Sequence, residues 1–154
     1  MAKTLTATLT GQVKYVYTKT RTIADTSESK TIEQSTSYTN GGAANQVQVL
    51  YAEQLIVTAA LPNQNLDLYG ALTDIFGDTL NFEHIKAILV RNKSTTVGDD
   101  VYFGPLGVDN PLASPWGGDT TAKNAIRAGG AFQIDAPLDG LVSSSTKTPF
   151  SFSR

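Results

Sequence analysis

Apolar and polar residues alternate along the first segment of the chain. In residues 5–17 the odd positions are mostly apolar, whereas threonine, glutamine and lysine fill most of the even ones. This period of two is typical of a half-buried β-strand, and Gly11 predicts a bend or bulge within it. Residues 18–46 are instead rich in small polar side chains, so we expect a polar hairpin or loop region there, with exposed strands at about 20–24 and 31–38.

Later segments predict further strands and one short helix. Alternation resumes at 47–51, another strand is expected at 55–57, and a late one at 131–136. Around residues 69–76 the apolar side chains change to spacings of three and four, and Gly77 follows. This segment therefore predicts one or two helical turns that end at the glycine.

The most apolar segment of the chain is residues 85–90. Apolar side chains on both of its faces predict a central strand covered on both sides, with Leu89 buried. Residues 97–103 are its expected hairpin partner. Residues 104–130 contain frequent glycine, proline and aspartate, which predicts a long irregular loop. Together, the pattern favours a single all-β domain over residues 1–154, an antiparallel sandwich or barrel with one short helix.

Composition excludes several classes of protein. The chain has 154 residues, no cysteine, a net charge of −2 and only 17% charged residues. Disulfides and thiolate chemistry are therefore absent, and no overall charge would attract nucleic acid or an anionic membrane. The longest aliphatic run, residues 87–90, is far short of the roughly 20 apolar residues of a membrane span. The first residues lack the apolar core of a secretion signal, so we expect mature protein.

The charges are nevertheless unevenly placed. Lys3, Lys14, Lys19 and Arg21 precede the first acidic residue, whereas acidic residues concentrate in the middle of the chain, at Asp67, Asp74, Asp78 and Glu83. Such charges are commonly the solvated faces of strands and loops. The alternative is a basic strand edge, with Lys14, Lys19 and Arg21, that docks on an acidic partner.

The sequence offers little for catalysis or metal binding. His84 is the only histidine, and with no cysteine and no nucleophile motif it cannot complete a catalytic triad or a zinc site. Asp99 and Asp100 match no calcium-binding loop and are expected to form a turn. The glycine pairs belong to no phosphate-binding motif. We therefore expect no catalytic residue, no metal and no cofactor, although sequence alone cannot identify facing carboxylates of a glycosidase.

Aromatic residues are the best candidates for binding. Trp116 lies in the glycine-rich stretch Pro115-Trp116-Gly117-Gly118, where it serves either as a contact residue or as part of the core. Phe150 and Phe152 are two residues apart in the last segment. They predict either an interface with another chain or a strand that folds back into its own core.

One long stretch carries a family resemblance. Residues 66–98, LDLYGALTDIFGDTLNFEHIKAILVRNKSTTVG, resemble a pattern of small structural proteins of tailed bacteriophages and prophages, in which a short helix ending in Phe-Gly precedes an apolar strand. Residues 46–51, Gly-Gly-Ala-Phe at 129–132 and Ala-Pro at 136–137 are similar to further elements of that pattern. The family's closing strand is abbreviated at residues 148–154, so we expect it to be either short or completed by a neighbouring chain.

The resemblance implies a function without catalysis. It implies a jelly-roll-like virion protein, most simply a decoration or cement protein that binds the major capsid protein and stabilises the phage head. The chain would be assembled in the bacterial cytoplasm as a homo-oligomer, with a trimer favoured, and would bind neither nucleic acid nor membrane. Alternatives are a tail, fibre or adaptor component of the virion, or a carbohydrate-binding β-sandwich with an aromatic platform around Tyr102 and Trp116.

Overall fold

The structure is a computed structural model that describes residues 4–19, 26–105, 122–142 and 149–154. Within these ranges the regular elements are all β-strands and none is a helix, which confirms the all-β class. The strands are β1 (Ala7–Lys19), β2 (Thr26–Asn40), β3 (Gln46–Val47), β4 (Asn63–Asp67), β5 (Tyr69–Thr73), β6 (Thr79–Asn81), β7 (His84–Ile85), β8 (Ala87–Arg91), β9 (Val101–Pro105), β10 (Asn124–Ile126), β11 (Ala131–Asp135), β12 (Leu141–Val142) and β13 (Pro149–Ser153).

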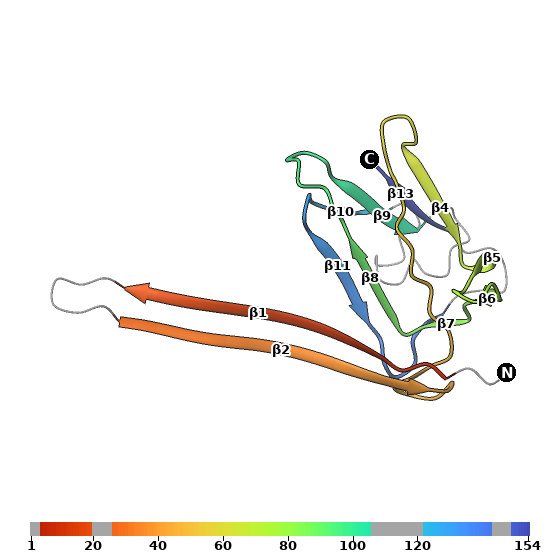
Figure 1. The fold of residues 1–154 in the computed structure, drawn as a ribbon, viewed down its shortest axis with the longest axis horizontal. Coiled ribbons are helices and arrows are strands. Elements are labelled where there is room, and N and C mark those ends of the chain that lie inside the picture. Colours follow the sequence, from red (N-terminus) through yellow and green to blue (C-terminus); the bar gives the residue numbers. More distant parts are fainter. Residues whose placement is uncertain (1–3, 20–25, 106–121, 143–148) are drawn as a thin grey trace.

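Two parts of the molecule are distinct in Figure 1. Strands β1 and β2 form a long two-stranded hairpin, here called the arm, which projects to the left of the remaining strands. The described residues from 41 onward form the body. Its sheets are small: a four-stranded sheet in the order β10-β9-β13-β4, and the pairs β11-β8, β12-β7 and β5-β6. All pairings are antiparallel except the short one between β2 and β3.

The arm is longer and more regular than its sequence predicts. Its strands pair without interruption from Ala7 opposite Tyr38 to Lys19 opposite Thr26. Of the bend or bulge predicted at Gly11, the bulge is therefore wrong. The predicted strand at 31–38 lies inside β2, whereas the predicted strand at 20–24 lies outside the described residues. A continuous partner strand supplies the backbone hydrogen bonds, and this pairing outweighs the weak intrinsic strand preference of the polar residues.

The core of the body is built around three phenylalanine rings from neighbouring strands. The ring of Phe103 on β9 lies 4.8 Å from that of Phe150 and 5.0 Å from that of Phe152, both on β13. Phe132 of β11 packs on the same ring at 5.5 Å. Buried aliphatic side chains complete this cluster: Leu68, Leu72, Leu80, Ile85 and Ile126.

The predicted helix at residues 69–76 is wrong. Residues 69–73 form β5, which pairs with β6 through a turn at residues 74–78. Glycines at both ends account for the difference: Gly70 and Gly77 have φ angles of 93° and 86°, which other residues rarely adopt. The Asp74 carboxylate accepts hydrogen bonds from the backbone of Phe76 and Asp78, which stabilises a turn rather than a helix.

The predicted central strand at residues 85–90 is also wrong in part. Ile85 is buried, but residues 87–91 form β8, which pairs with β11 alone, and Leu89 is 62% exposed. The expected hairpin with residues 97–103 is not formed, since Val97 is 96% exposed and β9 pairs with β10 and β13. One face of β8, with Ile88 and Val90, packs against the core, and the other face does not.

Of the remaining strand predictions, one is confirmed and the others are wrong or only partly correct. The strand predicted at 131–136 is confirmed as β11. Of residues 47–51 only the first belongs to a strand, β3, and residues 55–57 form none, although Leu55 and Val57 pack against the core. Within the predicted loop at 104–130, residues 124–126 form β10, and residues 106–121 lie outside the described ranges.

Candidate protein-interaction surface

The arm has one apolar face and one polar face. Residues directly opposite each other on antiparallel strands point to the same face, so the odd positions of β1 share a face with the even positions of β2. This face, here called the apolar face, carries Val13 opposite Ile32. Farther out it carries Tyr15 opposite Lys30 and Tyr17 opposite Glu28, so charged side chains lie beside the two tyrosines. The opposite face carries threonine, serine, glutamine, lysine and glutamate, with Val16 as its one aliphatic side chain in the described strands.

The base of the arm is fixed to the body through its apolar face. Tyr38 is only 2% exposed, and its hydroxyl hydrogen-bonds with the Asp135 carboxylate and with the Lys86 carbonyl oxygen, the latter at 3.1 Å. The Thr36 hydroxyl donates to the same carboxylate. Gly11 lies beside Gln133, whose side-chain nitrogen is 3.8 Å from the position of an added Cβ. The face of the arm that contacts β11 at the base is thus the same face that carries Val13 and Ile32 farther out.

Burial changes the acid–base behaviour of this anchor. Desolvation raises the pKa of Tyr38 well above its ordinary value, and the hydrogen bond and the negative charge of Asp135 raise it further. The phenol therefore stays protonated and keeps donating its hydrogen bond at any pH near neutrality. The anchor is a stable feature of the fold and not a titrating switch.

Beyond Gly11 the apolar face extends past the body. Val13 is 62% exposed and Ile32, directly opposite, is 56% exposed; Tyr15 and Tyr17 are exposed as well. Within the described chain no strand pairs with the outer edge of β1, and β3 pairs only with Thr39 and Asn40 of β2. An isolated two-stranded hairpin is only marginally stable in water, and an exposed apolar face of this kind marks an interaction site.

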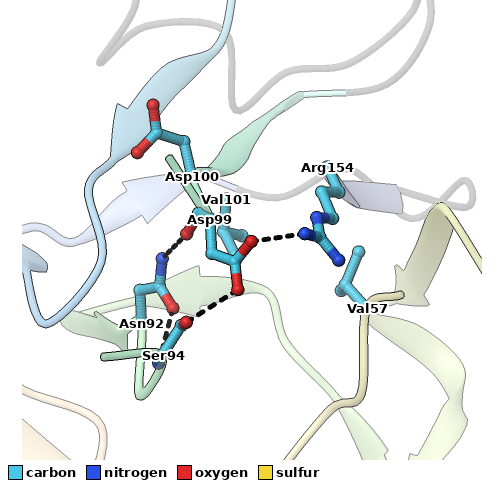
Figure 2. Close-up of a pocket in the computed structure, with 7 residues that line it drawn as sticks. All are labelled: Val57, Asn92, Ser94, Asp99, Asp100, Val101 and Arg154. Atoms are coloured by element: carbon cyan, nitrogen blue, oxygen red, sulfur yellow. Dashed lines mark hydrogen bonds and ion pairs between the residues drawn. The ribbon is translucent and has the colours of Figure 1, made fainter. Parts of the chain in front are cut away.

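A second candidate, shown in Figure 2, is a small pocket on the body. It is lined by Val57, Asn92, Ser94, Asp99, Asp100, Val101 and Arg154. Carboxylates and an arginine in one pocket are the kind of groups that bind ligands. Whether they are available depends on the contacts that they already make.

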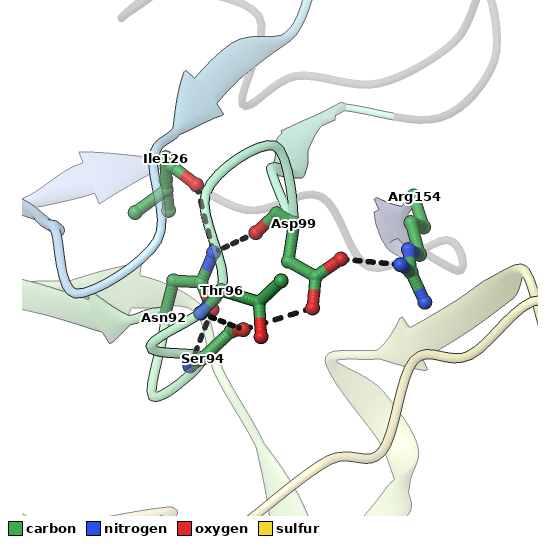
Figure 3. A network of polar contacts seen from close by, with 6 residues as sticks. All are labelled: Asn92, Ser94, Thr96, Asp99, Ile126 and Arg154. Carbon is green, nitrogen blue, oxygen red and sulfur yellow. Dashed lines mark hydrogen bonds and ion pairs between the residues drawn. The ribbon is translucent and has the colours of Figure 1, made fainter.

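Figure 3 shows that these polar groups bind one another. The buried Asn92 amide donates to the carbonyl oxygens of Asp99 at 2.7 Å and Ile126 at 3.0 Å, and its own oxygen accepts from the Ser94 backbone. The Asp99 carboxylate accepts from the Ser94 hydroxyl at 2.9 Å and forms an ion pair with Arg154. This network fixes the 92–99 turn to β10 and to the end of β13, so we assign it a structural role.

The neighbouring acidic residue is engaged in the same way. Asp100 is buried and forms an ion pair with Arg127, so both members of the Asp99-Asp100 pair have arginine partners. His84 is exposed and lies opposite Val142 in the β7-β12 pair. In the parts of the chain that the structure describes, no three histidine, cysteine, aspartate or glutamate side chains gather as metal ligands, and no helix is long and apolar enough to span a membrane.

The sequence-predicted interface residues fall into three groups. Lys14 lies exposed on the polar face of the arm. Lys19 ends β1, but its side chain is not described, and Arg21 and Trp116 lie outside the described residues. Phe150 and Phe152 are buried in the core, at 4% and 7% exposure.

The placement of the last two residues corrects the expected interface. Strand β13 pairs with β9 on one side and β4 on the other, both from its own chain, so the closing strand needs no neighbour. Two aromatic residues separated by one position share a face of a strand, and here that face meets Phe103. The alternative prediction, that the phenylalanines fold back into their own core, describes the structure.

Sequence reasoning missed the apolar face of the arm. The alternation in residues 5–17 predicts a half-buried strand, whereas Val13, Tyr15 and Tyr17 are exposed in the structure. The available signal was the partner strand: residues 26–40 contain only two large apolar side chains, Ile32 and Tyr38, too few to cover a strand of that length.

Comparison of the chain with protein families, with curated proteins and with solved structures finds no match in any of the three.

Proposed function

We propose that this chain is a structural protein of a virion, a decoration or cement protein of a phage head, and that it holds neighbouring protein subunits through its arm. The observation that supports this proposal is the exposed apolar face of an arm that is firmly anchored at its base. The sequence resemblance to small structural proteins of tailed phages supplies the setting. A tail or adaptor component of the same virion would use the arm in the same way.

The arm is suited to binding a protein surface. Burying an aliphatic or aromatic side chain contributes roughly 1.5–3 kcal/mol each, so Val13, Ile32, Tyr15 and Tyr17 together can support a modest contact. Association entropy offsets much of this gain. On a symmetric shell, however, the second and later contacts form at a high local concentration, so modest contacts add up to firm attachment.

The edges of the arm add a second means of attachment. The outer edge of β1 carries backbone donors and acceptors that no strand of the described chain pairs with. An extended segment of a partner can join such an edge as a further strand. The apolar face and the open edge lie on the same few residues, so one partner can engage both.

We propose no catalytic activity for the body. The group of polar side chains around Asn92 and Asp99 is satisfied by its own hydrogen bonds and by Arg154. Protein groups that are fully engaged in holding a turn are poorly placed to bind and transform a substrate. The body serves as the platform that positions the arm.

We infer that the body is a jelly-roll-like sandwich. The supporting contact joins two sheets: Phe132 of the β8-β11 pair packs on Phe103 of the four-stranded sheet. Sheets that share one aromatic core in this way are typical of sandwiches. An experimental structure tests this inference, and a body in which β8 and β11 join the four-stranded sheet edge to edge would contradict it.

The proposal is tested with a short-arm variant. Residues 13–32 are replaced by Asn-Gly, a pair that favours the tight turn of a hairpin, and Gln12 and Glu33 stay opposite each other. The anchor at Tyr38 is kept. The intact protein should cosediment with empty heads of the phage that encodes it, and the short-arm variant should lose that binding while its circular dichroism shows a folded body.

A matched pair of substitutions on the intact arm controls for general damage. Val13→Thr with Ile32→Thr removes apolar surface from one face and keeps β-branched side chains, so we expect binding to heads about tenfold weaker or more. Thr10→Ala with Ser35→Ala changes the opposite face by the same number of positions and should leave binding unchanged. If the short-arm variant binds heads as tightly as the intact protein, the arm is not the attachment element.

A further inference from the structure

Two charges of opposite sign lie among the tyrosines of the apolar face. Glu28 and Lys30 are two positions apart on β2, so both point to this face. Lys30 is opposite Tyr15, and Glu28 is opposite Tyr17. All four side chains are exposed, and neither charge is paired with another described residue. A partner of this face must therefore cover two aromatic rings and also match one positive and one negative charge.

A second copy of this chain meets these requirements by symmetry. A two-fold axis that reverses one arm relative to the other also reverses the order of the two charges along the contact. When the axis lies between the two tyrosine positions, Lys30 of each copy lies against Glu28 of the other, and Tyr15 lies against Tyr17. Each charge then gains an opposite charge as its partner. A purely apolar partner would instead bury both charges unpaired, at a large cost in free energy.

The attachment of the body determines the direction of the second arm. At the base the apolar face is already engaged, since the Tyr38 hydroxyl binds Asp135 and Gly11 lies beside Gln133. The open part begins at Val13, and in Figure 1 the outer part of the arm projects to the left, away from the body. Two facing arms that ran in the same direction would bring both bodies to the same end of the contact. The arms therefore fit together antiparallel, with one body at each end.

We propose that two copies of this chain pair through the outer parts of their arms, apolar face against apolar face and antiparallel. Lys30 of each copy pairs with Glu28 of the other, and Val13 and Ile32 lie at the ends of the contact. The proposal rests on the proposed function in that both assign partner binding to the arm. It names a second copy as the partner of the apolar face and leaves the open edge of β1 to a subunit of the head. A two-fold contact makes a dimer in place of the trimer expected from the sequence.

Exchange of the two charges tests the pairing. Glu28→Lys makes both charges on the face positive, and Lys30→Glu makes both negative. Sedimentation of each variant alone should show self-association about tenfold weaker than that of the native protein, or weaker still, because like charges face each other. An equimolar mixture of the two variants should restore association, because each positive arm then meets a negative one.

A matched control makes the same change of charge on the other face of the arm. Glu33 lies opposite Gln12 on the polar face, and its side chain is exposed. Glu33→Lys therefore alters the net charge by as much as Glu28→Lys does, but away from the contact. It should leave self-association unchanged, and circular dichroism should show that all three variants are folded.

Cysteine cross-linking identifies the face that meets the second copy, because the native chain has no cysteine. Tyr17→Cys places a thiol on the apolar face close to the axis, and a short bismaleimide should convert the protein to dimers. Val16→Cys is the control. This neighbouring position is 65% exposed but points to the polar face, so it should give little product.

Four results would each overturn the inference. They are a native protein that stays monomeric, equal weakening by Glu28→Lys and Glu33→Lys, a variant mixture that does not regain association, and equal cross-linking of Tyr17→Cys and Val16→Cys.

The outcomes also separate this inference from the proposed function. If the protein is monomeric yet binds heads through its arm, the pairing of arms fails and the proposed function stands. If the arms pair as described but the protein does not bind heads, the pairing stands and the head assignment fails.

Discussion

Replacing Phe152 with alanine removes a ring from the centre of the aromatic core. The side chain is 7% exposed, its ring lies 5.0 Å from that of Phe103, and its strand is paired on both sides. Truncating a buried phenylalanine costs about 3–5 kcal/mol, since the loss of transfer free energy is joined by the cost of a cavity. Domains of this size are stable by only about 5–15 kcal/mol, so the variant should be close to unfolding.

Guanidinium unfolding followed by far-ultraviolet circular dichroism measures this loss. The midpoint should fall strongly, and thermal unfolding should shift by roughly 10 °C or more. Val97→Ala is the control, because a side chain that is 96% exposed should change the free energy of unfolding by less than about 0.5 kcal/mol. A loss below about 1 kcal/mol for Phe152→Ala would refute the placement of β13 in the core. Deletion of residues 149–154 should prevent folding.

Three further predictions concern the Tyr38 anchor, the two tyrosines with raised pKa values, and Leu89 on β8. Tyr38→Phe leaves the Asp135 carboxylate without its phenol donor and should lower the free energy of unfolding by about 1–3 kcal/mol. Alkaline pH should also destabilise the fold. Burial, together with the hydrogen bond and negative charge of Glu53, raises the pKa of Tyr51 to about 12, and burial beside Asp135 raises the pKa of Tyr38 as well. The native state therefore keeps protons that the unfolded chain loses as the pH rises. The stabilisation is complete below about pH 10 and declines above it, and absorbance at alkaline pH should show Tyr38 and Tyr51 titrating late. A free energy of unfolding that does not fall above that pH contradicts this. Leu89→Ala should cost under about 1 kcal/mol in the monomer, because the side chain is largely exposed, and a loss of 2 kcal/mol or more would contradict its position.

Local patterns predicted the class of the fold and two of its strands. Alternation in residues 5–17 and 131–136 predicted β1 and β11, because the period of two in the side chains indicates a strand whether or not its apolar face is covered. The helix predicted over residues 69–76 is instead strand β5 followed by the turn at residues 74–78. Spacings of three and four between apolar residues arise both from a helix and from a strand that runs into a turn, and only the glycine conformations distinguish them here.

Long-range pairing could not be predicted in the same way. Residues 85–90 are apolar on both faces, yet β8 has one partner strand, since the chain turns at Asn92 and carries residues 101–105 into another sheet. The position of β13 between β9 and β4 likewise depends on edges that are formed far away in the sequence. The spacing of Phe150 and Phe152 predicted a shared face but not which surface that face would meet.

For the arm, too, the local pattern could be predicted from the sequence and the long-range pairing could not. Basic residues at the start of the chain suggested an interaction edge, and Lys14 does lie exposed on the arm. The apolar face became evident only once the register placed Val13 opposite Ile32 and the anchor at Tyr38 showed where the body ends. A pattern in one strand does not reveal whether its partner can cover it.

Binding of the intact and short-arm proteins to empty heads shows whether the arm attaches this protein to the head. Both proteins are labelled, mixed with heads over a range of concentrations and sedimented, and the bound fraction is compared. If the arm is the attachment element, the intact protein binds saturably and a folded variant that lacks residues 13–32 binds little or not at all. Equal binding of the two proteins, or no binding of the intact protein, would contradict it.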